Sequence, residues 1–388
     1  MEVKQIYTIV NGIYQELVGG TTVVEEDLTN VVDIGHEIFD NTSVDNYVKS
    51  LMNRIGKVVF VNRPYTGSVP SVLMDSWEYG SVLEKVQAET PVATENKSWE
   101  LVNGQSYPTD IFYKPTVSAK FFNNKVTFEV PMSFTELQVK ESFGSASELN
   151  GFMSMLYNAV DKAMTVRIDS LVMRTINNMI AQTIANDIPD SSDYRTTSTN
   201  RAINLLKLYN DKFNQSLTSA NALTDPEFIR FASYTIALYR DRMSKLSKLF
   251  NIGGKERFTP ASMLHTVMLS DFVNASKVYL ESDTYHNEDV ALPTTEVVPY
   301  WQGSGLNYSF SDISKVNVKT EGSENPVTVS VSGILAVMFD RDALGVCNSD
   351  RRVTTAYNAR AEFFNNYYKF DCSYYNDTNE NFIVFFIA

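Results

Sequence analysis

Few residues of this chain have the types and spacing that could support chemistry, and none forms a recognised catalytic or metal-binding pattern. The three histidines, His36, His265 and His286, stand alone, without an HxxxH or HExxH arrangement. His265 lies in an apolar segment and is predicted to be a hydrogen-bonded core residue, whereas His286 lies in a polar segment and is predicted to be exposed. The two cysteines, Cys347 and Cys372, lack metal-ligand spacing and are expected to remain reduced thiols.

Two short runs imitate reactive sites. Gly253-Gly254-Lys255 resembles part of a phosphate-binding loop, but the earlier glycine and the following Ser or Thr are missing, so a helix end explains it better. Asp340-Arg341-Asp342 offers two carboxylates and a cation at the end of a predicted strand, where an ion pair or a cap is a better explanation than acid–base catalysis. We therefore predict that the chain is not an enzyme and needs neither a cofactor nor a metal.

The aromatic and basic residues point to contacts rather than to catalysis. Trp77, Trp99 and Trp301 could stack on sugars, but the first two lie in an extended segment without an evident pocket. Because Trp and Tyr often anchor protein interfaces, we predict that these tryptophans, with Tyr79 and Lys85, contact neighbouring subunits. A carbohydrate-binding or carbohydrate-hydrolysing protein remains the alternative.

The main basic cluster consists of Arg240, Arg242, Lys245, Lys248, Lys255 and Arg257. Cations near the C-terminus of a helix are favourable in themselves, which predicts a solvated face. The alternative is a contact with an acidic neighbour, for which Arg240 and Arg242 are the candidates. No nucleic-acid-binding motif accompanies the charge.

Composition sets the class of protein. The 388 residues are 44% hydrophobic and 12% aromatic, which suits a folded chain of two or three domains. The net charge of −13 should repel nucleic acid rather than bind it. The N-terminus has neither a basic run nor an apolar stretch, so no targeting segment is expected. The longest apolar runs are too short to span a membrane.

The N-terminal third is predicted to be mostly extended. Residues 1–58 look like an arm with one or two short helices between residues 33 and 52, and Val58–Val61 reads as a strand. Prolines and glycines recur through residues 59–131, which excludes a long helix. Short strands are expected at Ser81–Val86 and Ser98–Val102, and Lys125–Val130 alternates as a half-buried strand that Pro131 should end.

One very long helix follows. Ser145 and Glu148 form a capping-box pattern. No proline interrupts the chain until Pro189, so about 40 residues should form a rod of roughly 60 Å. The apolar stripe follows a period of 3.6 better than 3.5, which favours packing on a core over a coiled-coil seam. Its predicted members are Phe152, Leu156, Ala159, Val160, Ala163, Met164, Ile168, Leu171, Val172, Ile176, Met179, Ile180 and Ile184.

The remainder is predicted to be an α/β domain followed by strands. Helices are expected at Ile203–Phe213 and from the start signal Asp225-Pro226-Glu227 to about Phe250, and a buried strand at Leu264–Leu269. From residue 327 onward strands dominate, and Asn376, Asp377 and Asn379 should form a turn before the last strand.

This order of parts resembles the major capsid proteins of tailed bacteriophages, which have the Hong Kong 97-type fold. The resemblance covers nearly the whole chain. It is carried by Phe128–Ser133 leading into Ser145–Ile184, by Val278–His286 with Pro299–Gly303, and by Ile334–Val346 with Arg351-Arg352 and Tyr357-Asn358.

The resemblance implies an α+β fold with an N-terminal arm, an extended β-hairpin loop, a long spine helix, and peripheral and axial domains. It assigns residues 1–58 to the arm, 59–116 to the loop, 117–189 to the peripheral domain with the spine helix, and 190–335 to the axial domain. Residues 336–388 become strands that return to both domains.

The resemblance also implies partners and a site of assembly. Copies would form pentamers and hexamers of an icosahedral head around double-stranded DNA, which the acidic surface would contact only weakly. A portal protein, a separate scaffolding protein and a decoration protein would be partners, and assembly would occur in the bacterial cytoplasm, without a membrane. An encapsulin-like compartment and a tail or baseplate protein are the structural alternatives.

Overall fold

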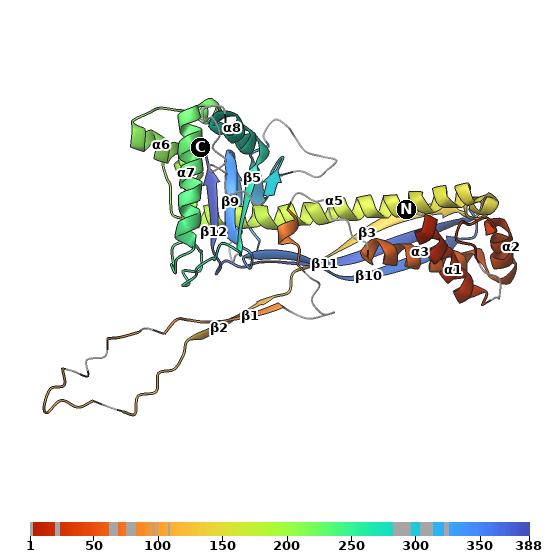
Figure 1. Cartoon of the computed structure of the whole chain (residues 1–388), viewed down its shortest axis with the longest axis horizontal. Coiled ribbons are helices and arrows are strands. Elements are labelled where there is room, and N and C mark those ends of the chain that lie inside the picture. The colour runs from red at the N-terminus through yellow and green to blue at the C-terminus, as the bar shows by residue number, and fades with distance from the viewer. Residues whose placement is uncertain are drawn as a thin grey trace.

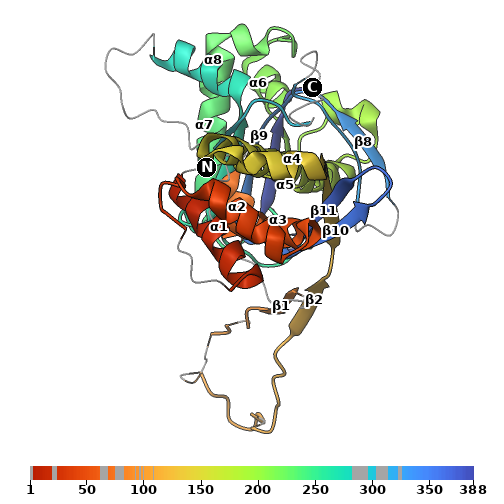
Figure 2. The same ribbon diagram turned by 90° about the vertical axis from the view of Figure 1, so that its right-hand side faces the viewer.

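The computed structural model describes residues 3–19, 24–61, 69–74, 83–91, 93–95, 98, 100–107, 109–281, 296–302, 313–321 and 326–388. Four parts are visible: a helical N-terminal part, a long helix beside a long sheet, a compact α/β part at the other end of that helix, and a projecting two-stranded ribbon (Figures 1 and 2). The mixed helical and sheet architecture confirms the predicted α+β class.

The long helix α5 (Ala146–Asp187) connects the two ends of the molecule (Figure 1). Its 42 residues span about 63 Å. Ser145 accepts a hydrogen bond from the Glu148 amide at 3.2 Å, which confirms the predicted N-cap. The buried stripe begins with Leu149 and Met153, whereas Ala159, predicted to lie in it, is exposed. From Leu171 onward the helix is buried on most sides.

Beside α5 lies a three-stranded antiparallel sheet in the order β10-β11-β3. Its strands are β3 (Lys125–Thr135), β10 (Leu344–Asn358) and β11 (Phe363–Asn376). One face packs against α5 through rings such as Phe128, Tyr368 and Phe370. The prediction that Pro131 ends β3 was wrong, because β3 is an edge strand and can accommodate a residue without an amide proton.

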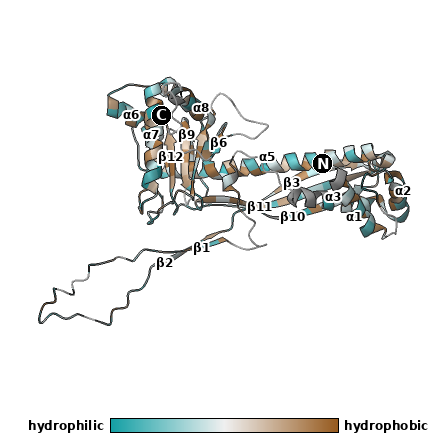
Figure 3. Ribbon diagram, viewed as in Figure 1, coloured by the Kyte–Doolittle hydropathy of each residue, from teal (hydrophilic) through white to brown (hydrophobic). Residues whose placement is uncertain are grey.

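The compact part is a five-stranded sheet in the order β4-β12-β9-β5-β6. Its strands are β4 (Ala202–Asn204), β5 (Leu264–Leu269), β6 (Glu296–Val298), β9 (Ile334–Asp340) and β12 (Phe382–Phe386). Every residue of β9 and β12 is buried, and both strands are strongly apolar (Figure 3). Alternate side chains join separate cores on the two faces, which is why these strands read as continuous apolar runs.

Three helices supply the second of these cores: α6 (Leu205–Phe213), α7 (Pro226–Met243) and α8 (Ser270–Glu281). The predicted start of α7 is confirmed, since the Asp225 carboxylate accepts from the Phe228 amide at 2.9 Å. The predicted end near Phe250 was wrong. The helix stops at Met243, and the chain then turns so that Ser247 pairs with Arg257 in a short antiparallel bridge.

The N-terminal part forms α1 (Val3–Leu17), α2 (Val31–Asn41) and α3 (Val44–Val61). The prediction of a strand at Val58–Val61 was therefore wrong. Ile6, Ile13 and Leu51 are fully buried in the core that also contains α5 side chains. Residues 1–58 are thus largely helical, because their apolar residues recur at helical spacing, and the short helices expected between residues 33 and 52 are confirmed.

Shorter elements complete the fold. Helix α4 (Glu136–Glu141) follows β3, and the small sheet of β7 (Val316–Lys319) and β8 (Thr328–Val331) packs on α5. Strands β1 (Leu83–Ala88) and β2 (Val117–Phe122) pair into the projecting ribbon. The described residues of the predicted strand Ser98–Val102 are not in a strand.

Candidate assembly surfaces

The ribbon is fixed to the rest of the chain through one buried carboxylate. Alternate residues of β1 and β2 face inward, and two of them are lysines. Lys85 Nζ lies 3.2 Å from Asp377 Oδ2, and Lys120 Nζ lies 3.1 Å from Asp377 Oδ1. The Asp377 side chain is 0% exposed, so it holds both strands from a site that water does not reach.

A second carboxylate lies beside the first. Gln87 of β1 donates to Glu380 Oε1 at 3.0 Å, and Arg257 Nε lies 3.2 Å from Glu380 Oε2. Burial raises the pKa of Glu380 despite the opposing effect of Lys85 and Arg257. We call Lys85, Lys120, Arg257, Asp377 and Glu380 the anchor cluster.

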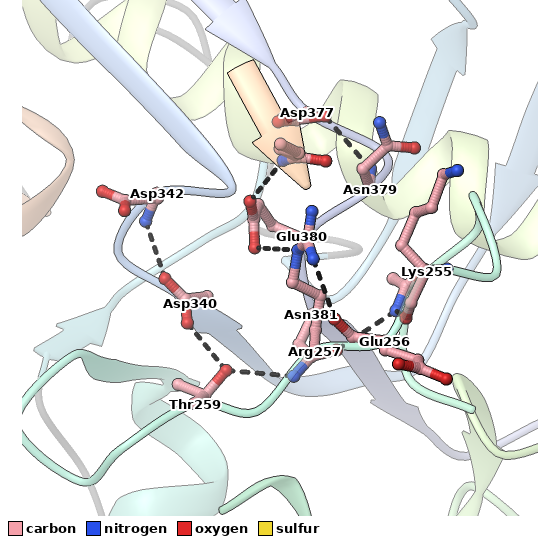
Figure 4. Close-up of polar contacts among 12 residues, drawn as sticks. Lys255, Glu256, Arg257, Thr259, Asp340, Asp342, Asp377, Asn379, Glu380 and Asn381 are labelled. Carbon is pink, nitrogen blue, oxygen red and sulfur yellow. Dashed lines mark hydrogen bonds and ion pairs between the residues drawn. The ribbon is translucent and has the colours of Figure 1, made fainter. Parts of the chain in front are cut away.

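Both carboxylates, those of Asp377 and Glu380, belong to the turn between β11 and β12 (Figure 4). The Asp377 amide donates to the Ala343 carbonyl at 2.7 Å, and the Asp377 carboxylate accepts from the Asn379 amide at 3.1 Å. A Cβ on Gly253 would lie 2.0 Å from Asn379 Oδ1, so only glycine allows this close approach. The predicted turn is confirmed, and its fixed geometry positions the anchor cluster.

The residues next to this turn are also polar. Thr259 donates to Asp340 Oδ2 at 2.7 Å, and the Asp342 amide donates to Asp340 Oδ1 at 3.0 Å (Figure 4). Asn381, fully buried, donates to Thr259 at 3.1 Å. The interpretation of Asp340-Arg341-Asp342 as a capping element, not an acid–base pair, agrees with these contacts.

The opposite face of the ribbon is apolar and uncovered within the described chain. Val86, Val117 and Phe121 point outward there, and Phe121 is 64% exposed. A two-stranded ribbon alone is only marginally stable in water, and an exposed apolar face adds a further cost. Beyond the ribbon, the loop between β1 and β2 exposes more large apolar side chains: Leu101, Val102, Tyr107, Ile111, Phe112 and Tyr113.

Two of the predicted contact residues belong to the interior of this chain. Lys85 also donates to the Asp342 carbonyl and lies over the Tyr375 ring at 5.1 Å, so it anchors the ribbon to its own subunit. Trp301 is fully buried and donates from Nε1 to the Ile334 carbonyl at 2.8 Å. Its role as an exposed interface anchor is contradicted, and its ring is equally closed to a stacked sugar.

The remaining contact residues divide into two groups. Arg240 and Arg242 are exposed on the last turn of α7, where Arg240 Nε lies 3.3 Å from Asp241 Oδ1 and Arg242 lies over the Tyr239 ring at 5.0 Å. Their contact with a neighbour stays a prediction. Trp77, Tyr79 and Trp99 lie outside the described residues.

The residues that might have supported chemistry remain dispersed. His265 is half-buried beside Phe339, and neither ring nitrogen has a hydrogen-bond partner within the described chain, so its predicted hydrogen bonding was wrong. Cys347 and Cys372 are buried and are not joined in a disulfide, and Cys372 donates to Asn348 Oδ1 at 2.9 Å, whereas His286 lies outside the described residues. Across the described ranges, no group of three or more His, Cys, Asp and Glu side chains could hold a metal. No helix within those ranges is long and apolar enough to cross a membrane.

Sequence reasoning missed most of the anchor cluster. It selected Lys85 as an intersubunit residue and treated Asp377 only as a turn residue. Lys120, Arg257 and Glu380 were not connected with either residue. The only available cue was the alternation of lysines with apolar residues on two adjacent strands, which does not identify the acidic partner more than 250 residues away.

Two kinds of comparison with known proteins give matches. A family model described as "Phi29-like phage major capsid protein" matches residues 6–386. A chain in the capsid structure of Staphylococcus phage Andhra aligns with a TM-score of 0.51 at 9% identity, covering 83% of this chain and 84% of that one. A chain in the structure of the head fibre and inner core protein gp22 of bacteriophage P68 aligns with a TM-score of 0.49 at 8% identity, covering 83% and 85%. A search of curated protein sequences gives no match.

Proposed function

The chain belongs to the Phi29-like phage major capsid proteins, and on that premise we propose that its copies form pentamers and hexamers of an icosahedral head enclosing double-stranded DNA. The capsid protein is a component of the virion, and its fold is that of the Andhra capsid chain. The feature that carries the proposal is the ribbon, which is anchored on one face and apolar and uncovered on the other. An exposed apolar face of this kind is typical of a surface that another protein covers.

The domain assignment follows the same premise. Residues 59–116 would form the extended loop, although α3 extends to Val61 and the ribbon strand β2 continues to Phe122. Residues 117–189 would form the peripheral domain with α5 as spine, and residues 190–335 the axial domain around the five-stranded sheet. Residues 336–388 return through β10, β11 and β12 to both domains. Residues 1–58 occupy the position of the N-terminal arm, but they form a layer of helices beside the N-terminal end of α5 (Figure 2).

The weak contact with DNA follows from the charge, and the protein partners follow from the resemblance to capsid proteins. An acidic chain of net charge −13 should touch packaged DNA only weakly. A scaffolding protein encoded separately would set the curvature of the shell, a portal protein would occupy one vertex, and a decoration protein would bind outside. Assembly would take place in the bacterial cytoplasm.

Loop replacement tests the proposal. Residues 90–115 are replaced by a two-residue Asn-Gly turn that rejoins β1 and β2, and the chain is expressed with its scaffolding protein. We expect a folded subunit with unchanged circular dichroism that forms no closed particles in negative-stain electron microscopy, whereas the wild-type chain forms them. A wild-type chain that forms no closed particles would contradict the proposal, and normal shells from the shortened chain would show that the loop is not needed for assembly.

A further inference from the structure

The chain contains three Asn-Gly pairs, and the fold places them in two different settings. Asn11-Gly12 and Asn150-Gly151 lie inside helices α1 and α5, whereas Asn103-Gly104 lies in the loop that projects beyond β1 and β2 (Figure 1). Such a pair can react with itself, because the backbone nitrogen of the glycine can attack the side-chain carbonyl carbon of the asparagine. Glycine has no Cβ to hinder this close approach. The backbone around each pair therefore determines whether the pair reacts.

The turn at Asn103 leaves the reacting nitrogen accessible. The Gln105 amide donates to the Val102 carbonyl at 3.3 Å and closes a turn whose two central residues, Asn103 and Gly104, are both exposed. Gly104 has a φ of +87°, which is typical of the third residue of a type II turn. Its amide donates to no other residue in the described part of the loop. A Cβ at Gly104 would meet no atom within 4 Å, so the space around the pair is open.

The two pairs in helices are protected. In each of them the glycine amide belongs to the hydrogen-bond pattern of the helix, and its nitrogen cannot turn toward the asparagine side chain without breaking that bond. The Gly12 carbonyl also accepts from Arg54 Nη2 at 2.8 Å, and the Asn150 side-chain oxygen accepts from the Ser154 hydroxyl at 3.4 Å. Reaction at these pairs requires local unfolding, whose free-energy cost lowers the rate.

The residues around Asn103 form an apolar and exposed surface. Leu101, Val102 and Tyr107 are 65%, 60% and 51% exposed. The Val102 amide donates to the Tyr107 hydroxyl at 3.1 Å, which folds this part of the loop around the turn. A new carboxylate within this surface would make the surface costly to cover, because burial of an unpaired charge is unfavourable.

We propose that Asn103 is a site of spontaneous modification, which limits the time for which an unassembled copy can enter a shell. A bond forms between the Gly104 nitrogen and Asn103 Cγ. The bond from Cγ to the side-chain nitrogen breaks, and ammonia leaves with the proton of the Gly104 amide. Water then opens the cyclic imide at either carbonyl and gives Asp or isoAsp, whose new carboxyl group releases its proton to solvent.

The two products change the loop in different ways. Both add one negative charge beside Leu101 and Val102. IsoAsp also places the former side-chain methylene of Asn103 in the backbone, so the turn closed by Gln105 cannot keep its geometry. The effect on assembly rests on the proposed function, whereas the reaction itself does not.

Ageing of the free subunit tests the reaction. Fresh wild-type subunit is incubated at neutral pH in water enriched in oxygen-18, then digested in ordinary water and analysed by mass spectrometry. The heavy oxygen distinguishes conversion during ageing from conversion during digestion. We expect the Asn103 peptide to gain one oxygen-18 atom at least tenfold faster than the peptides that contain Asn11 and Asn150. Equal rates at the three pairs, or no conversion at Asn103, would overturn the inference.

Two control variants isolate the chemistry. Asn103→Gln requires a larger and less easily formed ring, and Gly104→Ala places a Cβ beside the attacking nitrogen. Each variant should slow conversion at least tenfold, and circular dichroism verifies that each subunit is folded. Conversion of Asn103 at the wild-type rate in Gly104→Ala would contradict attack by the Gly104 nitrogen.

Assembly from an aged preparation tests the consequence. Wild-type subunit that contains both converted and unconverted copies is mixed with scaffolding protein, and the shells are separated from the subunits that remain. We expect the converted fraction to be several-fold lower in the shells, and aged Asn103→Gln to assemble as well as the fresh variant. Equal converted fractions in the shells and in the remaining subunits would overturn the limit on assembly. Fresh wild-type subunit that forms no shells would contradict the proposed function and leave the ageing result unchanged.

Discussion

The five-stranded sheet and the β1–β2 ribbon place their side chains in opposite circumstances. In β9 and β12 every residue is buried, and both faces contribute to cores made by the same chain. In the ribbon, one face rests on a polar cluster and the other exposes Val86, Val117 and Phe121. The sheet is complete within the subunit, whereas the ribbon is complete only within an assembly.

This difference separates folding from assembly within one chain. Burial of apolar surface stabilises the sheet before any neighbour arrives, at roughly 25 cal/mol for each Å² removed from water. For the exposed face of the ribbon we expect the same gain only if a neighbouring copy covers it. The ion pairs of the anchor cluster hold the ribbon in position in the meantime, because they need no partner subunit.

The largest effect on the stability of the subunit is expected from a substitution in the five-stranded sheet. Phe385→Ala removes a fully buried ring of β12 that packs edge-on against Tyr239 with centroids 5.8 Å apart. We expect the free energy of unfolding of the subunit to fall by about 3–5 kcal/mol, through lost burial and a residual cavity. Urea denaturation of the unassembled subunit measures it. A loss below about 1 kcal/mol would contradict the view that the sheet is stabilised within the subunit.

The second-largest effect on stability is expected at the anchor cluster. Asp377→Asn removes the buried charge that two lysines share. We expect a loss of about 2 kcal/mol, since hydrogen bonds to charged groups contribute about 1.5–3 kcal/mol and both lysines can recover some hydration. Limited proteolysis should cut residues 83–122 much faster in the variant, with the exposed pair Lys49 and Asp45 offering a control in Asp45→Asn. Equal cutting rates would show that the ribbon is positioned by something else.

Much of the fold could be predicted from local patterns. The N-caps at Ser145 and Asp225 and the buried strand Leu264–Leu269 were correct, because each depends on neighbours within a few residues. The errors arose where contacts with residues distant in the sequence determine the local structure. Pro131 continues a strand because β3 lies at a sheet edge, and Trp301 is buried because β9 passes beside it.

The candidate surfaces were only half predictable for the same reason. The extended loop follows from its prolines and lack of helical spacing, but its anchor joins Lys85 and Lys120 to a turn more than 250 residues later. The N-terminal residues show the converse error. Ile6 and Ile13 recur at helical spacing in α1, which was not predicted to be a helix, whereas the short helices expected between residues 33 and 52 were correct.

A smaller effect should appear in the pH dependence of the anchor. Burial raises the pKa of Glu380 above its usual 4.5, so burying the charged form costs stability. This cost is absent at low pH and develops as the pH rises from about 4.5 through the higher folded pKa. The wild type should therefore lose stability relative to Glu380→Gln over that range, measured by urea denaturation at each pH.

A matched variant separates this effect from general acid sensitivity. The pKa of Asp371 is lowered: burial raises it, but hydrogen bonds from Thr127 and Arg352 outweigh that effect. Its contribution to stability is present above the usual 3.8 and is lost as the pH falls through the lower folded pKa. Asp371→Asn should therefore be less stable than the wild type by a nearly constant amount above pH 3.8, and this difference should shrink only as the pH falls below that value. A stability difference between the wild type and Glu380→Gln that is flat from pH 4 to about pH 7 would contradict the raised pKa.

The smallest effect on the subunit should come from the exposed face of the ribbon, and it is the sharpest form of the comparison. Phe121 is 64% exposed, so Phe121→Ser removes little buried surface, and the free energy of unfolding should change by less than about 0.5 kcal/mol. In an assembly the same ring would be covered, so shell yield should fall although the subunit is intact. Phe385→Ala should have the reverse effect, because it lowers the stability of the subunit before assembly begins. A Phe121→Ser chain that assembles as well as the wild type would show that this apolar face stays in water in the shell, and the exposed rings of Phe112 and Tyr113 in the loop between β1 and β2 would then have to supply the contact alone.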